Sequence, residues 1–168
     1  FAPPEISDLY TGVKVPVLKP AYYNNYEIGG WYGLAAGKAA VEASLYRMQG
    51  NNEIISVRLD DGSYQNRNAG KTLHYGVEYT LKYTPSRSLL FIFNGTNAHH
   101  EFLDYQQNGK DYSHRTMNAA PGMIFNTEIT YKPGWLQGFR IAAEWQHVGK
   151  YFIDPANTQV YHGYELFN

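Results

Sequence analysis

Five stretches of this chain each place one glutamate between apolar residues that recur at every second position. In Val77–Tyr83, apolar residues alternate with Glu78, Thr80 and Lys82. Successive side chains of a β-strand point to opposite faces, so this stretch has one apolar face and one polar face. The other four glutamates of this kind are Glu27, Glu42, Glu128 and Glu144. The alternation predicts an all-β chain.

We expect about seven strands, because this period-two pattern recurs along the chain. Their approximate ranges are residues 23–34, 38–48, 72–84, 88–97, 122–132 and 138–148, and the seventh strand starts near Tyr161. A helix is a second interpretation of Ala35–Met48, since Ala, Leu, Glu and Met are good helix formers.

The connectors between these strands alternate in length. Residues 35–38, 85–87 and 133–137 are short connectors, whereas residues 48–71, 99–121 and 149–160 are long ones. Short turns at one end and long loops at the other are typical of a transmembrane β-barrel. A soluble sandwich has no reason to alternate so regularly. The pattern predicts an antiparallel up-and-down meander that is a segment of a transmembrane β-barrel.

Composition agrees with this fold class and excludes others. The chain has 168 residues, 16 of them Tyr, and only 17% of its residues are charged. Tyr favours strands and membrane–water boundaries. A net charge of -1 gives no electrostatic basis for nucleic acid as a partner, and the absence of Cys excludes disulfides and thiolate sites. The chain begins at Phe1 without a signal peptide and ends inside an expected strand, so we expect a fragment of a longer protein.

Several segments resemble, in order, the landmarks of one family. Leu18–Pro20 followed by Asn25–Gly29 resembles the L-x-P-E and N-Y-E-x-G signature of TonB-dependent outer-membrane receptors of the siderophore-receptor type, although Ala21 replaces the usual Glu. Further segments that are similar to family landmarks are Phe1–Pro4, Leu9–Tyr10, Asn68–Lys71, Gly76–Glu78, Ala120–Pro121 and Gly163–Tyr164.

The resemblance implies the C-terminal part of a barrel of about 22 strands with a plugged lumen. Residues 1–168 would be a partial barrel domain, and the plug, the earlier strands and the last strands would be absent. The implied function is uptake of a ferric siderophore or similar nutrient in the bacterial outer membrane, with energy from TonB through the absent N-terminal plug region. The implied partners are that ligand, TonB and membrane lipid. No cofactor, metal site or enzymatic activity is implied.

The resemblance also implies that the alternating polar residues form the wall of the barrel lumen. Charges of opposite sign can pair there, such as Glu78 with Lys82 and Arg140 with Glu144. The expected lumen-facing residues are Glu27, Glu42, Glu78, Lys82, Glu128, Arg140 and Glu144. Ile28, Val41, Val77, Tyr79, Ile129 and Ile141 are expected on the opposite, lipid-facing side.

Two long connectors carry residues that suit a ligand. Tyr64 and Arg67 lie in one of them, and Tyr112, His114 and Arg115 lie in the other. Arginine beside aromatic rings suits an anionic, partly aromatic ligand such as an iron chelate. The alternative is that both segments are ordinary polar loops.

Other motifs predict no chemistry. His99-His100-Glu101 has metal-ligating residue types, but neighbouring side chains of a strand point to opposite faces, so we expect no metal site there. The serines lack a Gly-x-Ser-x-Gly elbow, so we expect no enzyme. The alternative function is a self-contained β-rich binding module, either a small closed barrel or a carbohydrate-binding sandwich. A small closed barrel requires that the first and last strands pair.

Overall fold

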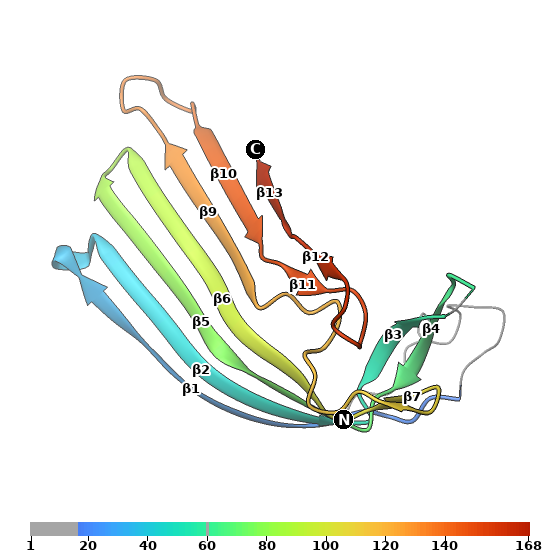
Figure 1. The fold of residues 1–168 in the computed structure, drawn as a ribbon. Coiled ribbons are helices and arrows are strands. Elements are labelled where there is room, and N and C mark those ends of the chain that lie inside the picture. Colours follow the sequence, from blue (N-terminus) through green and yellow to red (C-terminus); the bar gives the residue numbers. More distant parts are fainter. Residues whose placement is uncertain (1–16, 60) are drawn as a thin grey trace.

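The computed structural model describes residues 17–59 and 61–168, and the family-like segments Phe1–Pro4 and Leu9–Tyr10 lie outside these residues. One antiparallel sheet dominates the fold (Figure 1). Its strands are β1 (Tyr22–Leu34), β2 (Ala39–Asn51), β5 (Lys71–Ser86), β6 (Leu89–Asp104), β9 (Met123–Tyr131), β10 (Ile141–Val148) and β13 (Tyr164–Phe167).

Neighbours in the sheet follow chain order, so the expected up-and-down meander of seven strands is confirmed. The helix interpretation of Ala35–Met48 is wrong, because β2 fills most of this segment and only η1 (Ala35–Gly37) forms a single 3₁₀ turn. The expected seventh strand near Tyr161 starts later, at Tyr164. β1 and β13 are the two edges and do not pair with each other, so these seven strands form an open sheet.

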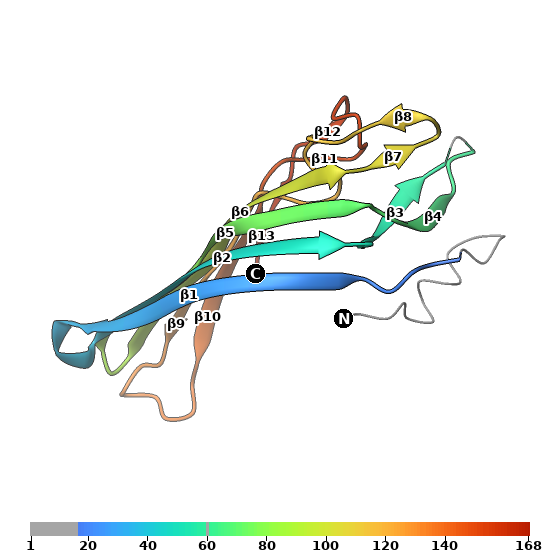
Figure 2. The same ribbon diagram turned by 90° about the horizontal axis from the view of Figure 1, so that it is seen from below.

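Short and long connectors lie at opposite ends of the sheet, as expected (Figure 1). The long connectors contain small hairpins that the sequence did not indicate. These hairpins are formed by β3 (Ile54–Arg58) with β4 (Tyr64–Asn68), β7 (Gln106–Gln107) with β8 (Lys110–Asp111), and β11 (Tyr151–Phe152) with β12 (Val160–Tyr161). Figure 2 shows them gathered beyond one end of the sheet.

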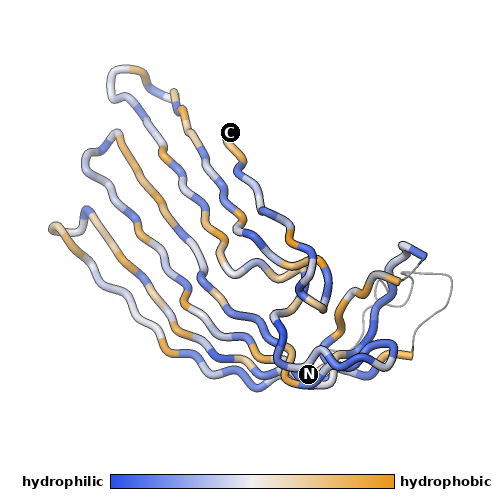
Figure 3. The backbone as a smooth tube through the Cα atoms, viewed as in Figure 1, coloured by the Kyte–Doolittle hydropathy of each residue, from blue (hydrophilic) through white to orange (hydrophobic). Residues whose placement is uncertain are grey.

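The strand register places the five glutamates on one face, which we call the glutamate face. Directly opposed residues of antiparallel strands share a face. Glu27 lies opposite Tyr46, which shares its face of β2 with Glu42 and Ser44. Glu42 lies opposite Thr80, and Glu78 lies opposite Ser44 and Thr96. Continuing across the sheet, Glu128 lies opposite Ile92 and Glu144. Hydropathy accordingly alternates along the strands (Figure 3).

The other face, which we call the apolar face, is covered by nothing in the described chain. Ile28 is 74% exposed and Leu45 is 58% exposed, although both are apolar. The same register places Ile28, Val41, Val77, Tyr79, Ile129 and Ile141 on this face, as expected. A contiguous exposed apolar surface of this kind marks contact with a membrane or another protein.

The hydrophobic core lies at the long-connector end instead of beneath the sheet. Its buried residues are Ile55, Val57, Ala69, Phe102, Tyr105 and Met117. A seven-stranded sheet in water would bury one of its faces against a second layer. Here the β3–β4 hairpin, the end of β6 and residues between 105 and 117 provide the packed interior, and the long middle parts of the seven strands do not. No helix among residues 17–59 and 61–168 is long and apolar enough to cross a membrane.

Candidate functional site: the loop cluster and the glutamate face

The three small hairpins and the connector 112–122 lie together beyond the long-connector end of the sheet, and we call them the loop cluster (Figure 2). Ile55 and Val57 of the β3–β4 hairpin and Met117 of the connector belong to the core. Phe102 stacks on Tyr105, with 4.5 Å between ring centroids, and Tyr112 packs against the same core. Burial raises the pKa of the Tyr105 hydroxyl to about 12, and this hydroxyl donates to Gln107 at 2.8 Å. The loop cluster is therefore a packed structure with its own interior.

Hydrogen bonds join the connector 112–122 to the loop between β11 and β12. Arg115 donates from Nη1 to the backbone carbonyl of Ala156 at 2.5 Å. Asn157 accepts from the backbone N–H of Thr116 at 3.1 Å and donates to the backbone carbonyl of the same residue at 2.8 Å. Side chains thus hold together two segments that lie about forty positions apart in the chain.

The five residues predicted as ligand contacts all belong to the loop cluster but have different surroundings. Tyr64 lines a cavity of about 310 Å³, whereas Arg67 donates to Gln65 at 3.2 Å and to Asn108 at 3.4 Å. Tyr112 packs inward and Arg115 holds the β11–β12 loop. The side chain of His114 is 77% exposed and lies 3.2 Å from Glu101. The structure brings these residues to one end of the sheet. Of the two cavities described there, the one of about 310 Å³ is lined by Tyr64, and the one of about 390 Å³ is lined by none of the five.

A buried polar network at the base of the β3–β4 hairpin was not predicted from the sequence. His74 lies between two partners, with Nε2 2.8 Å from Oε2 of Glu53 and Nδ1 2.8 Å from Nδ1 of His100. Thr72 also donates to Glu53. Burial alone would raise the pKa of the Glu53 carboxyl, but the hydrogen bonds from His74 and Thr72 outweigh it and lower this pKa below its usual value.

Strand register and one glycine create this network. His74 and His100 are directly opposed on β5 and β6, so their side chains share the glutamate face. Gly50 leaves the space for Glu53, because a Cβ there would lie 2.5 Å from Oγ1 of Thr72 and 3.1 Å from Oε2 of Glu53. The short turn at residues 85–87 indicated that the two strands pair, but a register shift between Tyr83 and Ser86 follows the turn. Counting from Ser86 opposite Leu89 would therefore place Glu101, and not His100, opposite His74.

A cavity of about 390 Å³ adjoins the network, between the end of β6, the connector 112–122 and the β11–β12 hairpin. His100 is part of its wall, so the cavity and the buried network share one side chain. The other lining residues are Ala98, His99, Thr116, Ala120, Gly122, Lys150, Tyr151, Phe152, Val160 and His162.

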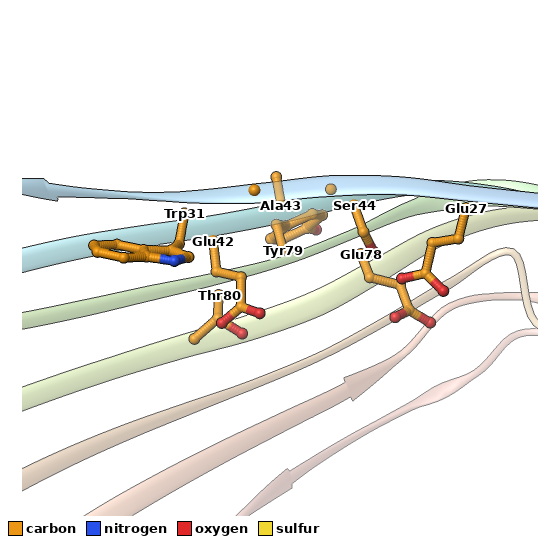
Figure 4. A pocket seen from close by; sticks show the side chains of 10 residues that line it. Glu27, Trp31, Glu42, Ala43, Ser44, Glu78, Tyr79 and Thr80 are labelled. Carbon is orange, nitrogen blue, oxygen red and sulfur yellow. The ribbon is translucent and has the colours of Figure 1, made fainter.

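Further along the glutamate face lies a hollow of about 680 Å³. Glu27, Glu42 and Glu78 project into it from three neighbouring strands, beside Trp31 (Figure 4). Lys82 shares this face but forms no ion pair with Glu78 within the described residues.

Arg140 pairs with Glu128 at 2.8 Å, so the expected pairing with Glu144 is wrong. The reason is the β9–β10 turn, which brings Arg140 back over Thr130 and Glu128 of the preceding strand.

An open meander with an exposed apolar face, an acidic opposite face and packed loops at one end is the architecture of an outer-membrane barrel segment. The family model described as TonB dependent receptor-like, beta-barrel, matches residues 1–168. The chain belongs to this family. It is thus part of a bacterial outer-membrane β-barrel, in a family of transport receptors.

Solved structures agree on the fold. The chain superposes with a TM-score of 0.68 and 15% identity on the copper transporter OprC, covering 99% of this chain and 26% of that one. The ferric preacinetobactin receptor BauA from Acinetobacter baumannii gives a TM-score of 0.67, with 17% identity and coverage of 94% and 23%. The ferric yersiniabactin uptake receptor FyuA from Yersinia pestis gives 0.66, with 18% identity and coverage of 93% and 23%.

The chain spans about a quarter of the length of these solved structures. No curated protein sequence is significantly similar to it.

Proposed function

We propose that this chain is the C-terminal part of the barrel of a receptor that imports a ferric siderophore or a similar nutrient, with energy supplied through TonB. The observation that carries the proposal is the open seven-stranded meander, which has an apolar face and a glutamate face. A protein that spans the membrane with strands needs the apolar face for lipid and the polar face for its lumen.

The two unpaired edges support a larger barrel. In a bilayer every backbone N–H and C=O group needs a partner, so an open sheet edge cannot face lipid. β1 and β13 each leave one edge without a strand in the described chain. We propose that further strands of the receptor close a barrel of about 22 strands, and that an N-terminal plug fills it and contacts TonB.

In this arrangement the glutamates, with Lys82 and Arg140, line the lumen, and the loop cluster lies on the outer side, where the ligand arrives. Arg67 and Arg115 are the proposed cations of that surface, with Tyr64, Tyr112 and His114 as their neighbours.

A self-contained binding module agrees less well with the described sheet. A small barrel would pair β1 with β13, and a sandwich would cover the apolar face with a second sheet, whereas the other described sheets are two-stranded hairpins.

The test is transport by the complete receptor. The gene that encodes this segment is deleted in its host, and uptake of radiolabelled iron is measured with a panel of ferric siderophores under iron limitation. We expect the deletion strain to lose uptake of at least one ferric siderophore and the complemented strain to regain it. The matched control is the complemented strain without TonB, which should take up no more than the deletion strain. Uptake of every chelate at the same rate in all three strains would refute the proposed function.

A further inference from the structure

The 390 Å³ cavity of the loop cluster combines basic side chains with aromatic walls. His99 borders it, but the ring of His99 lies on the opposite face of β6, beside Tyr75 and 3.7 Å from Glu101. Lys150, His100 and His162 also line it, and no carboxylate of the described chain does. Lys150 carries a positive charge, and each histidine can donate a hydrogen bond. Tyr151 and Phe152 provide apolar surface from the β11–β12 hairpin. This composition suits a small organic anion with an aromatic body, because the charge meets Lys150 and the ring meets the aromatic side chains.

His100 couples this cavity to the buried carboxylate of Glu53. One proton must lie between the Nδ1 atoms of His74 and His100, because two lone pairs or two N–H groups cannot face each other at 2.8 Å. When His74 is neutral and uses its Nε2–H for Glu53, the shared proton belongs to His100. Nε2 of His100 then has only a lone pair, which accepts and does not donate.

One additional proton reverses the role of His100 toward the cavity. If the pair takes up a proton, His100 carries Nε2–H and can donate to an anion. The positive charge is shared with His74, which lies 2.8 Å from the Glu53 carboxylate. Glu53 thus stabilises the protonated pair from the side opposite to the cavity. We propose that this cavity binds a small aromatic carboxylate, and that each anion bound is accompanied by one proton taken up by the His74–His100 pair.

The other titratable groups around this pair are few among the described residues. On the buried side, the ring of Tyr23 from β1 lies beside Gly50 and Glu53. On the cavity side, His99, Lys150, Tyr151 and His162 share the lining with His100. Two of these, His99 and His162, are histidines as well. The experiment must therefore distinguish a proton bound by the His74–His100 pair from a proton bound by another histidine of the cavity wall.

The experiment measures benzoate binding to the complete receptor in detergent by isothermal titration calorimetry. The proposal rests on the proposed function only in taking the aromatic carboxylate to be part of the transported chelate. Benzoate is used free, so failure of iron uptake with intact benzoate binding would count against transport and not against this site. Repeating the titration in buffers of different ionisation enthalpy gives the number of protons taken up. We expect about one proton per benzoate, and affinity that falls by about tenfold per unit of rising pH.

Variants identify the proton's location. Glu53→Gln removes the negative charge but keeps the size of the side chain, which does not line the cavity. We expect this variant to abolish proton uptake and to weaken benzoate binding by about tenfold or more. His100→Gln should do the same, whereas His162→Gln and the distant control His147→Gln should keep proton uptake. Migration of the unheated receptor on gels verifies that each variant is folded.

Three results would overturn the proposal. The first is benzoate affinity that does not change with pH. The second is full proton uptake in folded Glu53→Gln. The third is binding of uncharged benzamide as tight as that of benzoate.

Discussion

Glu128 and Glu144 lie directly opposite each other on β9 and β10, so two carboxylates share one position of the sheet. Like charges at such a position destabilise a strand pair. Arg140 compensates by binding Glu128 at 2.8 Å, and it also donates to Thr130 at 3.2 Å. A local basic residue thus balances an acidic pair on a face that we assign to the lumen.

Removing this arginine should expose the repulsion. We expect Arg140→Ala to lower the urea midpoint of the folded receptor, and Glu144→Gln to restore most of the loss when it is added to Arg140→Ala. Glu144→Gln alone should change the midpoint little or raise it. A midpoint for the double variant equal to that of Arg140→Ala would show that the two carboxylates do not interact.

The two faces of β5 should respond oppositely to a new charge. Leu81 is 41% exposed on the apolar face, and Thr80 lies opposite Glu42 on the glutamate face. We expect Leu81→Arg to destabilise the receptor by about 2–4 kcal/mol in a lipid bilayer, because arginine there must enter hydrocarbon. Thr80→Arg, one residue away, should cost far less because it faces carboxylates. Equal costs in urea titrations of receptor folded into vesicles would mean that the faces are assigned wrongly.

Gly50 should tolerate no side chain, because the space that a Cβ would need is already occupied by Thr72 and Glu53. We expect Gly50→Ala to destabilise the receptor by about 1–3 kcal/mol through overpacking. Gly30→Ala is the matched control, since no atom of the described chain lies within 4 Å of its Cβ position. It should change stability by no more than about 0.5 kcal/mol. Chemical denaturation measures both, and a Gly50→Ala receptor as stable as the control would refute the close contact.

Arg115 should act on the loops and leave the sheet unaffected. Its bond to the Ala156 carbonyl holds the β11–β12 loop, which is 41 positions away in the chain. We expect Arg115→Ala to accelerate proteolytic cleavage within residues 153–159 several-fold and to weaken ligand binding, with unchanged gel migration of the folded barrel. His114→Ala removes a side chain that is 77% exposed and should leave the cleavage rate unchanged. Identical cleavage rates for the two variants would show that Arg115 does not hold the β11–β12 loop in place.

The sequence predicted the sheet well because its signal is local. A strand repeats every two residues, so the alternation around Glu78 and Glu144 is sufficient to assign faces without knowledge of any partner strand. The predicted strand boundaries were wrong where the alternation of apolar and polar residues ended. β6 continues to Asp104 instead of ending at residue 97, through a segment that contains His99, His100 and Glu101.

The loops were less predictable for the same reason. β7, β8, β11 and β12 are each only two residues long, too short to show a period. Their positions depend on the core around Phe102 and on bonds such as those between Thr116 and Asn157. Tyr64, Arg67, Tyr112, His114 and Arg115 remain predicted ligand contacts, now with known neighbours.

By itself, the sequence determined the strand order, the turn positions and the face on which each glutamate lies, because these follow from a backbone period and from turn residues that act locally. Only the tertiary structure decided which side chains meet. Glu53, His74 and His100 are separated by 21 and 26 positions, and they meet because register and hairpin folding bring them together. The site therefore depends on long-range packing, whereas the sheet depends on a pattern that any short stretch of the chain already contains.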